Sequence, residues 1–160
     1  DIRQFGRVIW SKDIPAGLSQ LGPDPLEISL EEFVRRARSH RTNIKSLLLS
    51  QRFVRGIGNI YADELLFRSR VHPTLSSSSL SNEQLYRMGQ TMKALLEKAI
   101  CLGGSSISDY VDTSGRQGSF QKEHRVYGRE GKPCLNCGSP IERIVLAQRS
   151  THFCPVCQNF

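Results

Sequence analysis

Apolar residues recur at helical spacing in four stretches of the chain, and each stretch follows a residue type that begins helices. In the first, the capping box Ser29-x-x-Glu32 precedes an apolar series and predicts a helix over about 30–38. In the second, Asn43 is placed to cap a helix expected over 44–51. Basic residues gather at the end of the first helix, where they suit either a solvated helix terminus or contact with phosphate.

The third stretch joins a glycine hinge to a helix expected over about 60–70. Gly58 stands directly before Asn59, whose side chain is of a type that caps helices, and Asp63 and Glu64 suit the positive end of the helix macrodipole. A flexible glycine, exposed backbone N–H groups and the dipole together favour an anion, and phosphate is the usual one. The hinge is therefore a predicted phosphate site.

The fourth stretch is the longest helix. A second capping box, Ser81-x-x-Gln84, begins an amphipathic series that ends at Gly103 and Gly104. Cys101, near its end, is expected to be a small buried side chain. The four helices predict a mainly α fold with a four-helix bundle over 29–104.

Segments outside the predicted bundle show little helical periodicity. Residues 1–10 carry large apolar side chains and predict a strand that looks cut from something larger, and prolines and glycines mark 11–28 as a linker. The polar, glycine-rich part of 105–131 contains Arg116 and predicts a mobile loop. Such a loop suits either a plain surface connection or contact with an extruded base.

Basic residues outnumber acidic ones in the 160-residue chain. The net charge of +7 and pI near 9.5 favour a polyanionic partner, either nucleic acid or an acidic membrane, although solubility alone also accounts for a moderate excess. No apolar run reaches the roughly 18 residues of a transmembrane helix, and the first residues lack the layout of a signal peptide. We therefore expect an intracellular, non-secreted protein with no membrane partner.

Two cysteine pairs have the spacing of a zinc site. Cys134-x2-Cys137 and Cys154-x2-Cys157 can each present two thiolates to one tetrahedral ion. Two disulfides are the alternative, which a chain without a secretory signal disfavours. We expect one structural Zn²⁺ in a finger over 132–160.

The segment between the cysteine pairs is long enough for a β-hairpin. We expect its strands over 141–147 and 150–153, with Gln148 and Arg149 at the tip. Arg149 is then an exposed arginine on a rigid arm.

The order of several short motifs resembles the formamidopyrimidine-DNA glycosylase family over nearly the whole chain. These motifs are Lys45-x-x-Leu-Leu, Gly56-Ile-Gly-Asn-Ile-Tyr-Ala-Asp-Glu64, His72-Pro73, Gly103-Gly104-Ser-Ser, Val126-Tyr-Gly128 and Arg149-Ser-Thr-x-Phe-Cys-Pro-x-Cys-Gln158. The resemblance implies a helix-two-turn-helix DNA-binding unit followed by a four-cysteine zinc finger, with 1–10 as the last strand of a catalytic domain. It also implies a base-excision-repair enzyme that removes oxidised purines, such as 8-oxoguanine and formamidopyrimidines, and nicks the strand by β,δ-elimination.

The resemblance also implies DNA contacts on the helical unit and the finger. Asn59, beside Gly58 at the hinge, matches the residue that grips the backbone phosphate next to the lesion. Arg41 and Lys45 match basic positions on the same DNA-facing side. Arg149 matches the zinc-finger arginine that holds the phosphates flanking the flipped nucleotide and acts as proton donor in the δ-elimination step.

Three further matches concern the space around the lesion. Arg3 matches the residue that faces the orphaned cytosine, and Phe5 matches the side chain that wedges into the base stack. Arg116 falls within the loop that closes over 8-oxoguanine. The implied partner is double-stranded DNA containing oxidised purines or abasic sites, bound by a monomer.

The sequence departs from the family pattern at its start and at the hinge. The family begins with a proline, whose amine is the Schiff-base nucleophile, and a glutamate, whereas this chain starts Asp1-Ile2. We therefore expect the chain alone to bind damaged DNA without cutting it. Ser50 stands where an aspartate is common, and Arg55 stands where a small residue is common.

Two other classes of function stay open. A free-standing, non-enzymatic zinc-ribbon protein that binds nucleic acid is one, although the large apolar residues of 1–10 would then have no sheet to join. A protein-interaction scaffold is the other, and it predicts binding that is insensitive to salt, whereas phosphate contacts weaken steeply as salt rises.

Overall fold

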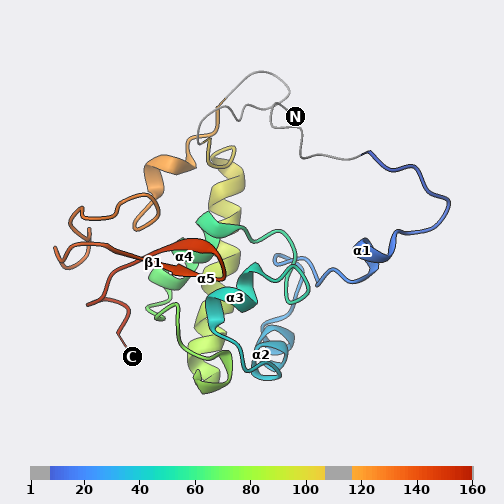
Figure 1. The fold of residues 1–160 in the computed structure, drawn as a ribbon, viewed down its shortest axis with the longest axis horizontal. Helices are drawn as coiled ribbons and strands as arrows, with labels where there is room; N and C mark the ends of the chain where they lie inside the picture. The colour runs from blue at the N-terminus through green and yellow to red at the C-terminus, as the bar shows by residue number, and fades with distance from the viewer. Residues whose placement is uncertain (1–7, 107–116, 160) are drawn as a thin grey trace.

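The computed structural model describes residues 8–106 and 117–159. In these residues five α-helices precede a two-stranded antiparallel hairpin (Figure 1). This confirms the prediction of a mainly α fold that ends in a β-hairpin. The elements are α1 (Ala16–Ser19), α2 (Leu30–Arg38), α3 (Ile44–Leu49), α4 (Asn59–Arg68), η1 (Ser77–Ser79), α5 (Asn82–Cys101), η2 (Phe120–Glu123), β1 (Glu142–Leu146) and β2 (Arg149–Phe153). No helix in these two ranges is both long and apolar enough to span a membrane.

Side-chain caps begin three of the helices. The Ser29 hydroxyl accepts from the Glu32 backbone N–H at 3.1 Å at the start of α2, and the Asn43 side chain caps α3 in the same way. Ser81 and Gln84 form the complete reciprocal capping box of α5. The box at α2 is only half formed, because the Glu32 carboxylate pairs instead with arginines one turn later in the helix.

The larger of two apolar clusters lies between the helices. α2 and α4 pack against α5, and α3 packs against α4 (Figure 1). The rings of Phe33 on α2 and Phe53, which lies in the hinge (52–58) between α3 and α4, are 5.1 Å apart, so the hinge is joined to this core. The fully buried large side chains of the cluster are Phe33, Phe53, Phe120, Ile44, Leu47, Leu48, Ile57, Leu65, Leu66, Leu80 and Leu85.

A second, smaller cluster holds the cysteine-rich region against α4. It combines Phe67 of α4 with Val126, Ile141 and two of the cysteines, Cys134 and Cys154. β2 also packs directly on α4. The hairpin is therefore attached to the helical core through α4.

The N-terminal prediction is only partly tested. Residues 1–7, and with them most of the predicted strand, lie outside the described residues. Val8 and Trp10 are exposed, at 104% and 86%, and form no regular structure. The segment 11–28 contains the four-residue helix α1 and no other helix or strand, and its role as a linker stays a prediction.

Of two side chains near the end of α5, Cys101 differs from the prediction that it is buried. Cys101 is exposed, like its neighbour Ile100, whereas Ala99 is buried on the other side of the helix end. Phe120, whose neighbour Ser119 is hydrogen-bonded to the Leu102 carbonyl oxygen, is fully buried and packs against Tyr61 at a ring distance of 5.4 Å. Its role in the described structure is in the core.

Candidate nucleic-acid interface and metal centre

Four cysteine sulfurs converge at the base of the hairpin. The Sγ atoms of Cys134, Cys137, Cys154 and Cys157 all lie within 4.8 Å of one another. Two of the separations are 3.9 Å and 3.4 Å, close to the roughly 3.8 Å between sulfurs that tetrahedral Zn–S bonds of about 2.3 Å require. The donor set and its spacing fit one structural zinc ion, as the sequence predicts.

The thiols of this cluster differ in how readily they ionise. Hydrogen bonds from Ser139 lower the pKa of Cys137 to about 6. Burial raises the pKa of Cys154 and of Cys157, so these two thiolates need the charge of the metal. Four thiolates and one Zn²⁺ lower the net charge of the chain from +7 to about +5, which leaves it basic.

The hairpin carries Arg149 as an exposed side chain. β1 and β2 pair in an antiparallel register that places Arg149 opposite Leu146. The two-residue turn consists of Ala147 and Gln148, whose φ values of 49° and 58° are typical of a tight hairpin turn. Arg149 is therefore the first residue of β2 and not part of the tip, which corrects the predicted hairpin by one position.

The hinge between α3 and α4 is closed by one side chain that sequence reasoning missed. The Gln51 amide oxygen accepts from the Gly56 N–H at 2.7 Å, and its nitrogen donates to the Ile57 carbonyl oxygen at 3.1 Å. Gly56 has φ +83°, a conformation that favours glycine. The signal in the sequence is a glutamine at the end of a helix followed five residues later by glycine.

Asn59 does not cap α4, contrary to the prediction. Gly58 occupies the N-cap position in an extended conformation, and Asn59 is the first helical residue with no side-chain capping bond. The half-buried Asn59 amide instead donates to the Ser150 carbonyl oxygen on β2 at 2.9 Å. Asn59 thus joins the hinge to the strand that carries Arg149.

Lys45 is buried and does not face solvent, which corrects the expectation that it contacts DNA directly. Its side chain is 0% exposed, and its ammonium group donates to Asp63 Oδ1 at 2.5 Å. The same group donates to the Ser150 carbonyl oxygen at 2.9 Å and to Thr151 Oγ1 at 2.8 Å. Burial lowers the pKa of Lys45, and the charge of Asp63 opposes that shift.

Asp63 and Glu64 are also interior residues, although both were expected to serve the helix dipole. Asp63 Oδ2 accepts from the His152 backbone N–H at 2.9 Å. Glu64 Oε1 accepts from three consecutive backbone N–H groups, those of 125–127, at 2.8 to 3.1 Å. Both carboxylates fasten later parts of the chain to α4, and only their position in the second turn of an apolar helix hints at burial.

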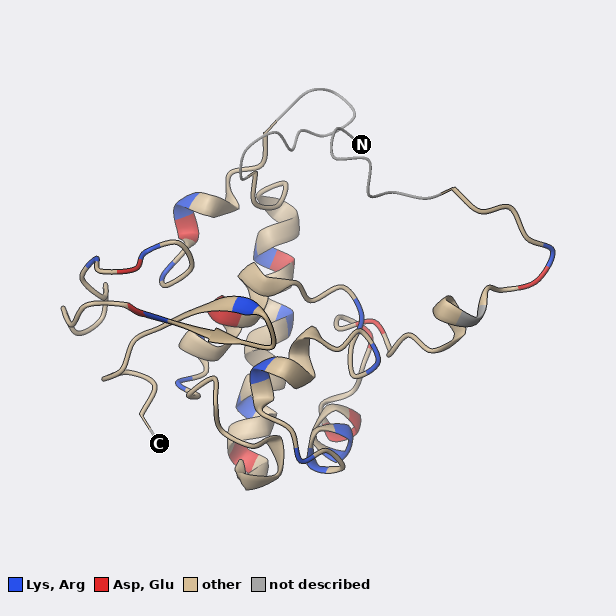
Figure 2. Cartoon of the chain, in the orientation of Figure 1, with Lys and Arg blue, Asp and Glu red and all other residues tan. Residues whose placement is uncertain are grey.

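Exposed basic residues include several at the end of α2, in the segment after it and on the hairpin. Figure 2 shows Lys and Arg at the end of α2 and in the segment after it. Arg41, in that segment, and Arg149 are exposed, and neither side chain forms a hydrogen bond or ion pair with the part of the chain that the structure describes. The structure brings Gly58, Asn59 and Arg149 to one region, whereas Arg3, Phe5 and Arg116 lie outside the described residues.

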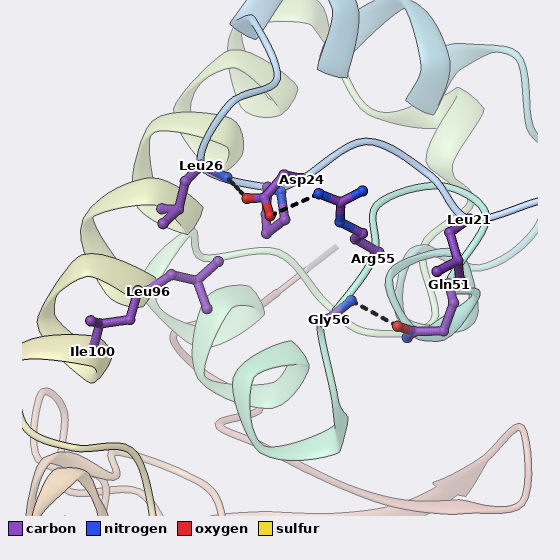
Figure 3. A pocket seen from close by; sticks show the side chains of 9 residues that line it. Leu21, Asp24, Leu26, Gln51, Arg55, Gly56, Leu96 and Ile100 are labelled. Carbon is purple, nitrogen blue, oxygen red and sulfur yellow. Dashed lines mark hydrogen bonds and ion pairs between the residues drawn. The ribbon is translucent and has the colours of Figure 1, made fainter. Parts of the chain in front are cut away.

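A groove of about 420 Å³ runs beside the hinge (Figure 3). Arg55 lines it and pairs with Asp24 at 3.3 Å, so this departure from the family pattern is used in a surface ion pair. Ser50, the other departure, is the C-cap of α3. The apolar side chains of the groove are Leu21, Pro25, Leu26, Leu96 and Ile100.

Two family models match the chain, one over the helices and one over the cysteine-rich region. Residues 21–111 match the formamidopyrimidine-DNA glycosylase H2TH domain, and residues 131–159 match the zinc finger found in FPG and IleRS. A formamidopyrimidine-DNA glycosylase from Solibacter usitatus is 52% identical over 159 residues, and one from Thermus thermophilus is 45% identical over 168 residues. Each alignment covers 99% of this chain but only 60% and 62% of the relative, respectively.

Solved structures of similar proteins have the same fold over most of the chain. The MutM (Fpg) protein of Thermus thermophilus matches with a TM-score of 0.84 and 47% identity, covering 88% of this chain and 55% of that one. A Lactococcus lactis Fpg in complex with abasic-site DNA matches with a TM-score of 0.84 and 39% identity, covering 91% and 55%. By fold, by zinc-binding cysteines and by sequence over more than half its length, the chain belongs to the formamidopyrimidine-DNA glycosylase H2TH family.

Proposed function

We propose that the chain binds double-stranded DNA containing an oxidised purine or an abasic site. The observation that supports this most is the hydrogen bond between Asn59 and Ser150, because it holds the hinge directly beside the strand that begins with Arg149. Gly58 and Asn59 then offer backbone and amide N–H groups to one phosphate, and Arg149 offers its guanidinium to another. Arg41 adds a further exposed cation.

The whole protein is proposed to act as a DNA glycosylase and AP lyase of base-excision repair. It would remove 8-oxoguanine and formamidopyrimidines and nick the strand by β,δ-elimination, with Arg149 as the proton donor in the δ step. As proton donor, its guanidinium would act on the negative charge that develops on the leaving phosphate beside it. Arg3, Phe5 and Arg116 are proposed to fill and cover the site of the extruded base.

The parts of the chain are proposed to divide this work. Residues 29–104 form the helix-two-turn-helix unit, in which α2 to α5 act as one four-helix bundle that supports the hinge. Residues 132–160 form the zinc finger, and 105–131 supply the lesion loop. Residues 1–10 belong to a catalytic domain, and 11–28 link that domain to the helix-two-turn-helix unit. We propose that the protein works as a monomer, since one hinge and one finger together supply both phosphate contacts.

The 160-residue chain alone is proposed to bind without cutting. The chain covers only 60% of the length of the Solibacter usitatus relative, and no match within it corresponds to the proline amine and glutamate that the resemblance implies for Schiff-base chemistry. Borohydride reduction on an 8-oxoguanine duplex should therefore trap no covalent adduct. A trapped adduct would show that another amine of this chain reaches C1′ of the sugar.

A fluorescence-anisotropy titration tests the binding proposal. The zinc-loaded chain should bind a duplex with a tetrahydrofuran abasic-site analogue more tightly than the same duplex without a lesion. The logarithm of the association constant should fall linearly with the logarithm of salt concentration, by about 0.9 for each phosphate contact on duplex DNA. Binding that is independent of salt would instead support the protein-interaction scaffold.

A further inference from the structure

Two side chains on one face of α4 each hold a different residue of β2. Asn59 and Asp63 are four residues apart in the helix and so lie one above the other. The Asn59 amide donates to the Ser150 carbonyl oxygen, and Asp63 Oδ2 accepts from the His152 backbone N–H, both at 2.9 Å. The His152 ring nitrogen Nδ1 also lies 3.2 Å from Asp63 Oδ2.

The spacing of these two contacts matches between the helix and the strand. Four residues of an α-helix advance about 6 Å, and two residues of an antiparallel strand advance about 6.8 Å. The hydrogen bonds of Asn59 and Asp63 can therefore form together only when β2 lies in this one register along α4. A slip of one residue would turn the side chains of β2 to the opposite face and leave the Asp63 carboxylate without its backbone donor.

Lys45 adds further hydrogen bonds to the contact between α4 and β2. Its buried ammonium group donates to Asp63 Oδ1 on α4 and to the Ser150 carbonyl oxygen and Thr151 Oγ1 on β2. All three of its N–H donors are therefore used where β2 packs on α4. The Ser150 carbonyl oxygen accepts from both Lys45 and Asn59. A buried charged group with every partner in place favours one geometry over alternatives.

We infer that Asp63 is a positioning residue that fixes the register of β2 on α4 and thereby sets Arg149 at a defined place relative to Asn59. Asp63 itself is buried and touches no DNA; it acts through His152 and through Lys45. This inference rests on the proposed function, because it treats Asn59 and Arg149 as the two phosphate contacts whose relative placement matters. It predicts that these two residues contribute cooperatively to DNA affinity.

A buried ion pair can be removed as a unit without the cost of leaving one charge alone. We therefore choose the variant Lys45→Met with Asp63→Leu, in which apolar side chains replace the pair. The matched control is Lys98→Met with Glu123→Leu, which removes an exposed ion pair of 2.7 Å that lies on α5 and η2. Both double variants are made in the zinc-loaded 160-residue chain.

The first readout is the coupling between Asn59 and Arg149. Asn59→Ala, Arg149→Ala and the combination are compared for their dissociation constants on the abasic-analogue duplex, within each of the three backgrounds. In the unaltered chain and in the control, the combined loss should differ from the product of the single losses by about threefold or more. In the Lys45→Met, Asp63→Leu background the losses should multiply to within about twofold, and retained coupling there would overturn the inference.

The second readout needs no DNA. Amide hydrogen exchange at His152 should be at least about tenfold faster in the Lys45→Met, Asp63→Leu variant than in the control, while amides of α2 stay protected. Failure of every background to bind the duplex would count against the proposed function, and the exchange result would still decide this inference. Unchanged exchange at His152 in a folded variant would show that Asp63 does not hold β2.

Discussion

The side-chain amide of Asn59 donates a hydrogen bond of 2.9 Å to the carbonyl oxygen of Ser150. This bond connects the first residue of α4 with the second residue of β2, so it joins the hinge before α4 to the hairpin of the zinc finger. An asparagine amide has two N–H donors, and Ser150 accepts from one of them. We propose that the other binds a phosphate oxygen, so that Asn59 would belong to both the interior and the DNA interface.

Replacing Asn59 with alanine should weaken DNA binding much more than folding. The variant loses one hydrogen bond, but the Ser150 carbonyl oxygen keeps its bond from Lys45, and Asn59 Oδ1 is a buried acceptor with no partner in the described structure. We expect a stability loss below about 1 kcal/mol by denaturant titration, and at least tenfold weaker binding of the abasic duplex. A stability loss above about 2 kcal/mol would indicate that the amide is mainly structural.

Replacing Arg149 with alanine should reduce affinity without changing the melting temperature. The side chain is exposed and has no partner among the described residues, so its loss leaves the hairpin intact. The slope of log association constant against log salt should fall by about 1. Arg143→Ala is the matched control, because Arg143 is an exposed arginine on β1 of the same hairpin, and it should leave the slope unchanged. Equal effects of the two substitutions would show only a general dependence on charge.

Replacing Glu64 with alanine should be strongly destabilising. One buried carboxylate oxygen accepts from the backbone N–H groups of 125–127, and the alanine variant leaves these donors without an acceptor. We expect a loss on the order of 3 kcal/mol in the free energy of unfolding, measured with urea. Glu97→Ala, an exposed glutamate on α5, should change it by less than about 0.5 kcal/mol. Similar values for the two variants would contradict the anchoring role of Glu64.

Replacing Cys154 with serine should unfold the finger and leave the larger helical core folded. Cys154 is a buried metal ligand and part of the smaller apolar cluster, whereas the core between α2, α4 and α5 does not contain it. Circular dichroism should retain most of the helical signal while zinc content falls to near zero. Cys101→Ser is the control, since Cys101 is exposed and outside the metal cluster. Loss of zinc in that control would show that the assigned ligand set is incomplete.

Local signals in the sequence were enough to predict helices α2 to α5 and the metal site. α2 has the predicted bounds because Ser29, the residue directly before it, caps it. The metal site was predicted because the spacing within each cysteine pair is typical of zinc ligands. The start of α4 was predicted wrongly because an extended glycine took the N-cap position in place of Asn59. The helix ends depend on residues within a few positions of one another, and so does each of the two cysteine pairs.

Long-range partners could not be predicted in this way. The groups that bury Lys45 lie 18 and 106 residues away along the chain, so no local pattern distinguishes it from a surface lysine. The one available signal is its place on a short helix three residues before Leu48, which is buried. Burial of Asp63 and Glu64 likewise depends on β2 and on 125–127, which pack on α4 only in the folded chain.

Removing zinc from the chain tests most directly whether the hinge and the finger form one DNA-binding surface. The dissociation constant for the abasic-analogue duplex is measured before and after chelation, with circular dichroism to verify that the helices remain folded. We predict a loss of at least about tenfold in affinity, because the hinge keeps Asn59 while Arg149 loses its fixed position. An unchanged dissociation constant for the zinc-free, helical chain would show that the finger takes no part in binding.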